Sequence, residues 1–224
     1  MKSPARIIFE KEIDRLMKSD GFDTKTIASV RQYYKKVSDN IWLSIGFGFT
    51  SYMYPGHIGV SSSLGICFDN ISRLNYQLNE LHRYTKYCLH PTISHELYML
   101  LPGAEFFEYD LDQSNLEAIP LTCRQIMNDI HQYGSVFFDR YQDWDNVVYS
   151  FEKEKGYTDY ERDTILPIMY YLMGNKQKGL DYIKRRLEEP LTSPDSVRIK
   201  RKAYTYTNGD VFLKNYYALP EIPD

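Results

Sequence analysis

The sequence predicts an α+β protein, in which an antiparallel β meander flanked by helices is followed by a C-terminal helical segment with a helix hairpin. Three observations lead to this fold class. Between residues 26 and 68, apolar and polar residues alternate over several segments, as in half-buried strands. The connections between these segments are too short for parallel crossovers, so we expect antiparallel pairing. From residue 114 onward, apolar residues recur at helical spacing.

The first elements are a helix and three strands. An amphipathic helix is predicted over residues 4–18, because Pro4 suits a first turn and Asp20-Gly21 ends a helix. The strands predicted after it are Thr26–Val37, Ile41–Thr50 and Ile58–Phe68. The second strand has the clearest alternation, with one apolar face and one face of mostly small residues. Its apolar face carries Ile41, Leu43, Ile45, Phe47 and Phe49, and its other face carries Trp42, Ser44, Gly46, Gly48 and Thr50.

The remaining elements are mostly helical. A helix is predicted from residue 69, with a buried side formed by Ile71, Leu74, Leu78 and Leu81. Two further strands are predicted at Ser94–Leu101 and Glu105–Leu111. Four apolar stripes then predict helices, and Gly174-Asn175 joins the last two as a helix hairpin. The stripes begin at Ile119, Trp144, Ile165 and Leu180.

The absence of a long linker predicts one α+β domain over residues 1–190. Within it, residues 1–112 form the helix and the antiparallel sheet, and residues 113–190 form the helical half. Residues 191–224 are expected to be a C-terminal tail. There, Val197–Thr207 and Val211–Tyr217 flank Asn208-Gly209, a strong signal for a β-hairpin.

Composition narrows the class of function. The chain has 224 residues and a net charge of −3, which makes nucleic acid an unlikely partner for the whole domain. Three cysteines at wide spacing do not make a disulfide framework, so a cytoplasmic location with reduced thiols is expected. No apolar run approaches the roughly 20 residues of a membrane span. We therefore expect no membrane association.

Motifs for catalysis or metal binding are incomplete. His95-Glu96 begins a zincin-like motif, but Met99 stands where the second histidine is required. Cys88 and His90 with His95 would give three zinc ligands, but no fourth is evident. Gly46-x-Gly48 lies inside a strand and lacks the third glycine of a dinucleotide motif. We expect no catalytic residues, no metal and no cofactor.

The charged stretches provide the candidate binding surface. Residues 139–163 hold eight acidic and four basic residues. Helical spacing gathers Asp145, Tyr149 and Glu152 on one side of a helix, with Asp143 just before it. An acidic face with an exposed tyrosine suits a basic protein partner, whereas the alternative is an ordinary solvated face. The basic stretch Lys184–Lys202 has no assigned role and could contact nucleic acid or an acidic protein.

The first half of the chain resembles a known family in its residue pattern. After the opening helix come Gly21-Phe22, Val30-Arg31-Gln32-Tyr33-Tyr34-Lys35-Lys36, Ile41-Trp42-Leu43-Ser44-Ile45-Gly46-Phe47 and Leu64-Gly65-Ile66-Cys67-Phe68. Over residues 5–112 this pattern resembles the bacterial domain-of-unknown-function 4304 family. That family has no established catalytic residues to carry over. Proteins of this sort are similar to bacterial immunity proteins, so the resemblance implies an inhibitor that neutralises one toxin by binding it.

Three functions are therefore considered. The first is a non-catalytic immunity protein that binds a basic toxin domain through Asp143, Asp145, Tyr149 and Glu152. The second is a structural or regulatory protein that uses the C-terminal helices as a binding groove. The third is an enzyme with a non-standard site, lined by the small face of the second strand and by His57, Glu96 or Asp110. The identity of the partner, the oligomeric state and a ligand on the small face stay open.

Overall fold

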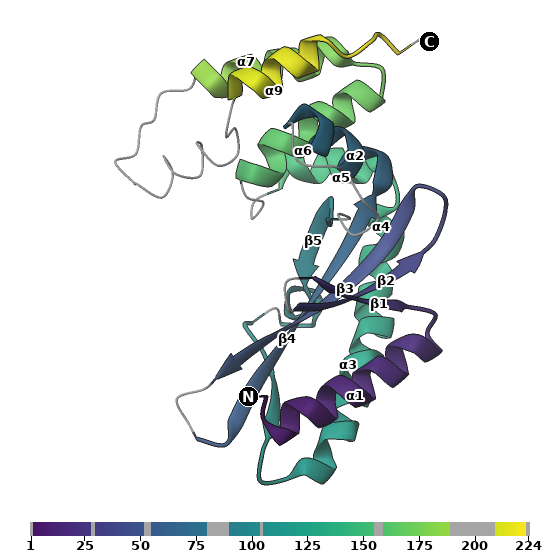
Figure 1. The fold of residues 1–224 in the computed structure, drawn as a ribbon, viewed down its shortest axis with the longest axis vertical. Coiled ribbons are helices and arrows are strands. Elements are labelled where there is room, and N and C mark those ends of the chain that lie inside the picture. Colours follow the sequence, from purple (N-terminus) through teal and green to yellow (C-terminus); the bar gives the residue numbers. More distant parts are fainter. Residues whose placement is uncertain are drawn as a thin grey trace. The chain divides into compact units, whose positions relative to one another are not determined.

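The computed structural model shows the α+β class that the sequence predicts (Figure 1). It describes residues 2–27, 30–51, 55–79, 90–103, 105–154, 159–188 and 209–222. The chain divides into two compact units, and each unit is built from two separate segments. Unit 1 comprises residues 1–67 and 93–142, and unit 2 comprises residues 68–92 and 143–224. The boundary between the two units therefore does not lie between residues 112 and 113, where the sheet half was expected to end and the helical half to begin. The single domain over residues 1–190 stays a prediction.

Unit 1 is organised around an antiparallel sheet. The described strands are β1 (Asp23–Ile27), β2 (Val30–Lys36), β3 (Ile41–Ser51), β4 (His57–Phe68), β5 (Ile93–Glu96) and β6 (Tyr109–Asp112). They run in the order β1-β2-β3-β4-β5, and β6 pairs with β4 as well. The predicted strands Ile41–Thr50 and Ile58–Phe68 are thus confirmed as β3 and β4.

Three predicted strands differ from the structure. Thr26–Val37 is not one strand, because β1 and β2 pair with each other and Ile27 stands opposite Val30. The expected strand Ser94–Leu101 is shorter, since β5 ends at Glu96 and the 3-10 helix η1 (Leu97–Leu100) follows. Likewise, only the last part of Glu105–Leu111 is extended, as β6.

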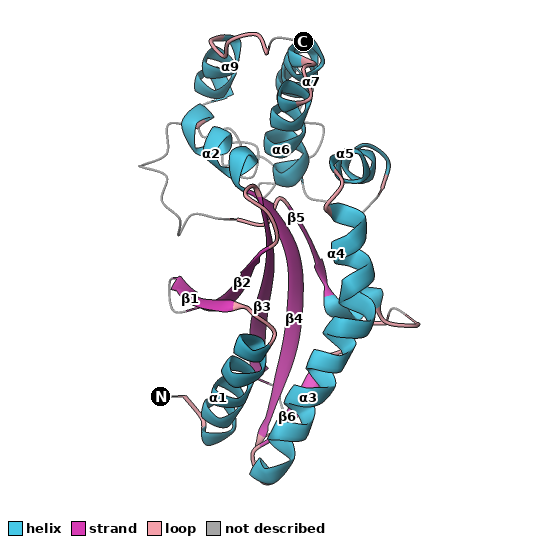
Figure 2. Cartoon of the chain, turned by 90° about the vertical axis from the view of Figure 1, so that its right-hand side faces the viewer, coloured by secondary structure: helices cyan, strands magenta, loops and turns pink. Residues whose placement is uncertain are grey.

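One face of the sheet carries the core of unit 1. The apolar side of β3 contacts α1 (Pro4–Ser19), where Phe9 lies edge-on to Phe47 and Phe49 with ring centroids 5.6 Å apart in both pairs. Next along the chain come η2 (Leu116–Ala118), α3 (Ile119–Asp129), a π-helical turn η3 (Ile130–Gly134) and α4 (Ser135–Tyr141). A side chain at Gly134 would meet Leu64 of β4 at 2.8 Å, so the turn packs directly on the sheet. Figure 2 shows α1, α3 and α4 beside the strands.

The opposite face of β3 is lined by small residues, as its alternation predicts. A Cβ atom at Gly46 would lie 2.9 Å from the Ser63 hydroxyl of β4, and one at Gly48 would lie 2.6 Å from that of Ser61. The two glycines therefore leave room for the serines of the neighbouring strand. Because of this contact, the small residues serve the packing of β3 against β4.

Unit 2 is helical in the residues described. It contains α2 (Asp69–Leu78), α5 (Trp144–Lys153), α6 (Asp159–Leu172), α7 (Lys176–Glu188) and α9 (Gly209–Tyr217). The predicted helix hairpin is confirmed as α6 and α7, which are joined through Gly174 at a φ of 77°. Asn175 then accepts a hydrogen bond from the Lys178 backbone N–H at 3.1 Å, which caps α7. No helix in the described part of the chain is long and apolar enough to cross a bilayer.

The predicted strand Val211–Tyr217 is wrong, because these residues belong to helix α9. The strand was predicted because Asn208-Gly209 is a signal for a hairpin turn, but tertiary packing outweighs this local signal. Phe212, Tyr216 and Leu219 are buried at the i, i+4, i+7 spacing of one helix face and the turn that follows it. The other predicted arm of the hairpin, Val197–Thr207, and Asn208 lie outside the described residues.

Candidate functional site

The face predicted to bind a partner lies on α5 of unit 2. Asp143 is the N-cap of this helix, and its carboxylate accepts a hydrogen bond from the Asp145 backbone N–H at 3.0 Å. Both aspartates are exposed, and Tyr149 is 57% exposed. On the other side of the helix, Val147 and Phe151 are buried and fix its position. All four predicted site residues, Asp143, Asp145, Tyr149 and Glu152, are thus exposed on unit 2.

Glu152, the fourth predicted residue, is exposed, but its carboxylate is bonded to other residues of the unit. Its Oε1 accepts hydrogen bonds from the Tyr170 hydroxyl at 2.6 Å and from Lys178 Nζ at 2.8 Å. Burial alone would raise the pKa of this carboxyl, but the hydrogen bonds from Lys178 and Tyr170 and the nearby positive charge lower it overall. Glu152 is therefore an ionised link between α5, α6 and α7, which differs from the freely exposed acid that helical spacing suggested.

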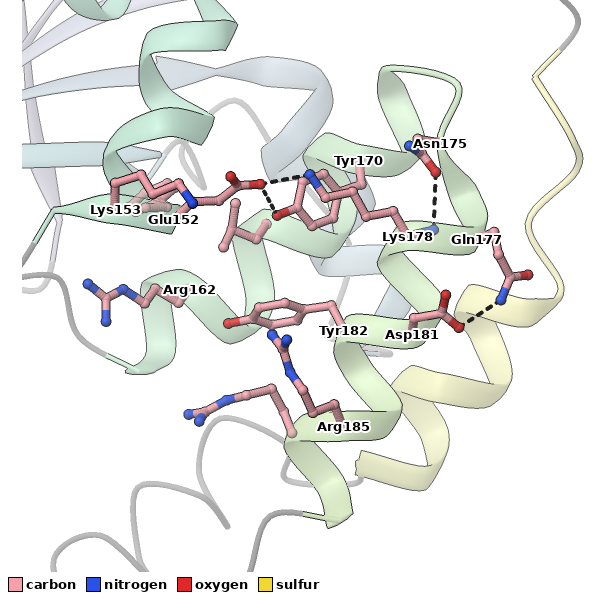
Figure 3. A pocket seen from close by; sticks show the side chains of 13 residues that line it. Glu152, Lys153, Arg162, Tyr170, Asn175, Gln177, Lys178, Asp181, Tyr182 and Arg185 are labelled. Carbon is pink, nitrogen blue, oxygen red and sulfur yellow. Dashed lines mark hydrogen bonds and ion pairs between the residues drawn. The ribbon is translucent and has the colours of Figure 1, made fainter.

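This link lies beside a groove of about 820 Å³ (Figure 3). The groove is lined by residues of α5, α6 and α7 and of the turn between α6 and α7. The residues that line it are Phe151, Glu152, Lys153, Arg162, Leu166, Tyr170, Asn175, Gln177, Lys178, Asp181, Tyr182, Arg185 and Arg186. Basic residues outnumber acidic ones in this set. The groove is therefore positively charged, although the chain as a whole is negative.

A buried ion pair supports one wall of the groove. Arg186 donates to both carboxylate oxygens of Asp163, at 2.6 and 3.1 Å, and the Tyr182 hydroxyl donates to the same group at 3.1 Å. Asp163 is only 4% exposed. Because a buried carboxylate is stable only when its charge and lone pairs are satisfied, this pair fixes α7 against α6 and neutralises Arg186.

Other cations of the groove have no such compensation. Within the described part of the chain, Lys153, Arg162 and Arg185 form no ion pair with a carboxylate. Arg162 Nη2 donates to the Glu154 carbonyl at 2.5 Å, while its Nε is buried without a hydrogen-bond partner. Arg185 lies 5.2 Å above the ring of Tyr182. Arg162 is thus held by a backbone carbonyl and Arg185 by an aromatic ring, so their charge is available to a ligand. Lys153 is exposed and acts on Glu152 through its charge.

The residues considered for an enzyme site are only partly brought together. His57 Nδ1 lies 2.8 Å from Asp110 Oδ2, and this hydrogen bond raises the pKa of His57. Glu96 stands opposite Ser63 of β4. Since Ser63 is six residues from His57 along an extended strand, Glu96 is roughly 20 Å from the pair. Burial raises the pKa of Glu96, and its Oε2 is buried without a partner, but it shares no site with His57.

The zinc hypothesis concerned Cys88, His90 and His95. Cys88 lies outside the described residues, so the structure does not test this set. In the described part of the chain, no group of three or more His, Cys, Asp or Glu residues is arranged to hold a metal ion. His95 instead packs against Phe137 and Tyr141, with ring centroids 5.4 and 6.0 Å apart.

The groove was missed by the sequence analysis, although one signal for it was present. Lys178, Tyr182 and Arg185 recur at i, i+4, i+7 and so share one face of α7. Lys153 of α5 and Arg162 of α6 lie within the stretch 139–163, which is acidic as a whole. Their positive charge is therefore hidden when charges are counted along the sequence. Only the packing of the helices reveals that these residues line the same groove.

Comparisons with protein-family models, with curated proteins and with solved structures find no match to this chain. The resemblance to the domain-of-unknown-function 4304 family therefore stays a hypothesis that rests on the residue pattern alone.

Proposed function

We propose that the chain is a non-catalytic protein-binding module, an immunity-type inhibitor that neutralises a toxin by binding it. The observation that carries this proposal is the exposed face of α5. Tyr149 is 57% exposed on a helix whose opposite side is buried, and Asp145 lies one turn before it. Tyrosine is one of the residue types that protein interfaces favour at their anchor points, and charged residues such as these aspartates belong to the polar rim around such an anchor.

The face is also rigid before any partner arrives. The Asp143 cap satisfies the first turn of α5, and Glu152 is tied to Tyr170 and Lys178 near its end. A preformed helix face loses little conformational entropy on binding, so more of the contact energy appears as affinity. In this proposal Tyr149 is the aromatic anchor, Asp143 and Asp145 attract the partner, and Glu152 holds the helix in place.

The partner proposed for this face is a basic protein domain. Exposed aspartates attract a positively charged surface over a distance of about one Debye length, which speeds association at low salt. A toxin that acts on a polyanion such as nucleic acid has a surface of this kind. The proposal includes no membrane and no direct contact with nucleic acid.

The test begins with a partner identified by co-purification and then prepared in pure form. We expect Asp145→Lys to slow its association at low salt, and the loss should shrink at high salt. Tyr149→Ala should mainly speed dissociation, by on the order of 30-fold for an anchor worth about 2 kcal/mol.

Glu117→Lys is the matched control, because Glu117 is an exposed acid in unit 1 and the charge change is the same. Rates that are equal for Asp145→Lys and Glu117→Lys would place the interface elsewhere. Binding that leaves the toxicity of the partner unchanged would refute the inhibitory role.

A further inference from the structure

We propose that the basic groove between α5, α6 and α7 binds a small ligand that carries two or more linked phosphate groups. This inference is separate from the protein-binding face, because neither Asp145 nor Tyr149 lines the groove. Three features support it: the positive charge of the groove, the unpaired hydrogen-bond donor of Arg162, and the cations that already cover the rings of Tyr170 and Tyr182.

The charge of the groove is unbalanced in a specific way. Glu152 pairs with Lys178, and Asp163 pairs with Arg186. Asp181, the other acidic residue that lines the groove, accepts a hydrogen bond from Gln177 and offsets one positive charge. In the described residues, Lys153, Arg162 and Arg185 have no carboxylate partner. Figure 3 shows that these three come from different helices around the groove, α5, α6 and α7. An anion placed there would be approached by cations from several directions.

Arg162 has unused hydrogen-bonding capacity. Its Nη2 is anchored to the Glu154 carbonyl, but its Nε is buried without an acceptor. A buried donor left unsatisfied destabilises a protein, because its lost hydration is not replaced. A rotation of the guanidinium toward a ligand oxygen would remove this penalty. Because guanidinium presents a planar fork of donors, phosphate oxygens match it well.

The aromatic rings of the groove argue for recognition through charge. The hydroxyl groups of Tyr170 and Tyr182 are bonded to Glu152 and Asp163. Lys178 Nζ lies 4.1 Å from the Tyr170 ring centroid, and the Arg185 guanidinium lies 5.2 Å from that of Tyr182. One face of each ring is thus already covered by a cation. The rings position positive charge, and the groove does not depend on stacking with a base.

Size and charge together select the ligand class. A volume of about 820 Å³ lies within the range of sites for small molecules, roughly 300–1,000 Å³. Asp181 also lines the groove, so five basic and three acidic residues, with Asp163 included, give a net charge of +2. A single phosphate carries about −1.5 to −2 and can match this charge, whereas linked phosphates add acceptor oxygens for donors that come from three helices. A long nucleic acid would also meet the net charge of −3 on the chain, which opposes extended polyanions.

The experiment is calorimetric titration of the whole chain with tripolyphosphate, adenosine triphosphate and hexaglutamate. We expect both phosphate ligands to bind, with hexaglutamate at least tenfold weaker. Equal affinity for the two phosphate ligands would identify the polyphosphate itself as sufficient, and tighter binding of adenosine triphosphate would identify a nucleotide as the source. Undetectable binding of both phosphate ligands, or equal affinity for hexaglutamate, would overturn the proposal.

Variants locate the site. Arg162→Gln and Arg185→Gln should each weaken tripolyphosphate by on the order of tenfold or more, since a charge-assisted hydrogen bond contributes about 1.5–3 kcal/mol. Lys153→Gln, a change at an exposed side chain, gives a weaker loss and protects the test if an arginine variant fails to fold. Arg124→Gln, at an exposed arginine of α3 in unit 1, is the matched control. A loss as large in the control as in the groove variants would refute the assignment.

Discussion

A single methyl group at Gly179 should destabilise unit 2, although the same change usually stabilises a helix. Gly179 lies in α7, and a Cβ atom there would lie 1.9 Å from the Tyr216 hydroxyl oxygen and 3.1 Å from the Pro167 carbonyl oxygen. Tyr216 is fully buried in α9, and its hydroxyl donates to that carbonyl at 2.7 Å. The glycine therefore makes room for a buried hydrogen bond between α9 and α6.

The expected magnitude follows from three opposing effects. In an exposed helix, Gly→Ala stabilises by about 1 kcal/mol. At Gly179 the new methyl group displaces the Tyr216 hydroxyl, which loses a hydrogen bond worth about 1 kcal/mol. Overpacking of a buried site adds a further penalty of about 1–3 kcal/mol. The balance predicts that Gly179→Ala lowers the free energy of unfolding by about 1–3 kcal/mol.

Urea denaturation followed by circular dichroism measures this change, and a double-mutant cycle identifies its cause. In the Tyr216→Phe background the hydroxyl is absent, so Gly179→Ala should be less destabilising by about 1 kcal/mol. Gln177→Ala, at an exposed position of the same helix, should change stability by no more than about 0.5 kcal/mol. A stabilising effect of Gly179→Ala, or strict additivity with Tyr216→Phe, would refute the reasoning.

Three further predictions concern titration, thiol reactivity and cooperativity. The hydrogen bond that His57 donates to Asp110 raises the pKa of His57 above its usual value, so the pair stabilises the fold at lower pH, and this contribution is lost as pH rises through the folded pKa. Asp110→Asn should lower that pKa in an NMR titration. Burial raises the pKa values of Cys67 and Cys123 to about 12, so neither thiol is reactive at pH 8 in the folded chain. In a variant whose third cysteine is replaced by Ser, a disulfide reagent should label these two thiols only after unfolding. Rapid labelling of the native chain would contradict this prediction. The segments of the two units alternate along the chain, so we expect the units to unfold together. Thiol exposure reports on unit 1, and the fluorescence of Trp144, with the other tryptophan replaced by Phe, reports on unit 2. Both signals should change at the same urea concentration, and separate midpoints would show that the units unfold independently.

The sequence was informative where local pattern and tertiary packing agree. In β3, the period-two alternation places Ile45 and Phe47 in the core and Gly46 and Gly48 on the other face, as expected. In the same way, Gly174 marks the turn of the α6–α7 hairpin because its φ of 77° favours glycine. At these positions the side chain itself determines the backbone or the buried face.

Local pattern failed where pairing partners decide the structure. β1 and β2 pair with Ile27 opposite Val30, yet the sequence of residues 23–36 has no glycine, proline or asparagine to mark a break between two strands. At α9, Asn208-Gly209 suggested a hairpin, but burial of Phe212 and Tyr216 against other helices selects the helical spacing. Such contacts join distant segments and cannot be read from a short window.

The site shows the same limit. Counting charges along residues 139–163 pooled acids and bases that belong to different surfaces. Asp145 is exposed on α5, whereas Arg162 lines the groove. Glu152 was placed on the acidic face by helical spacing, but its carboxylate is bonded to Lys178. Helical spacing predicts the side of a helix correctly, but it does not reveal which neighbour lies there.

The position of Glu152 allows the two proposals to be separated by one substitution. Its carboxylate neutralises Lys178 and is already engaged, so it offers little charge to a partner on the α5 face. Glu152→Gln keeps an acceptor for the Tyr170 hydroxyl but frees Lys178, which adds positive charge to the groove. Tripolyphosphate should therefore bind about two- to tenfold more tightly at low salt, and the gain should fall as salt screens it.

The same variant should leave association with the basic partner nearly unchanged, whereas Asp145→Lys should slow it. Glu117→Gln removes an equal charge from an exposed acid of unit 1 and controls for the net charge of the chain. If Glu117→Gln strengthens tripolyphosphate binding as much as Glu152→Gln, the effect comes from net charge and the groove is not the site. If Glu152→Gln instead weakens the partner as strongly as Asp145→Lys does, the contact face extends over the end of α5 and the helix-holding role of Glu152 is wrong.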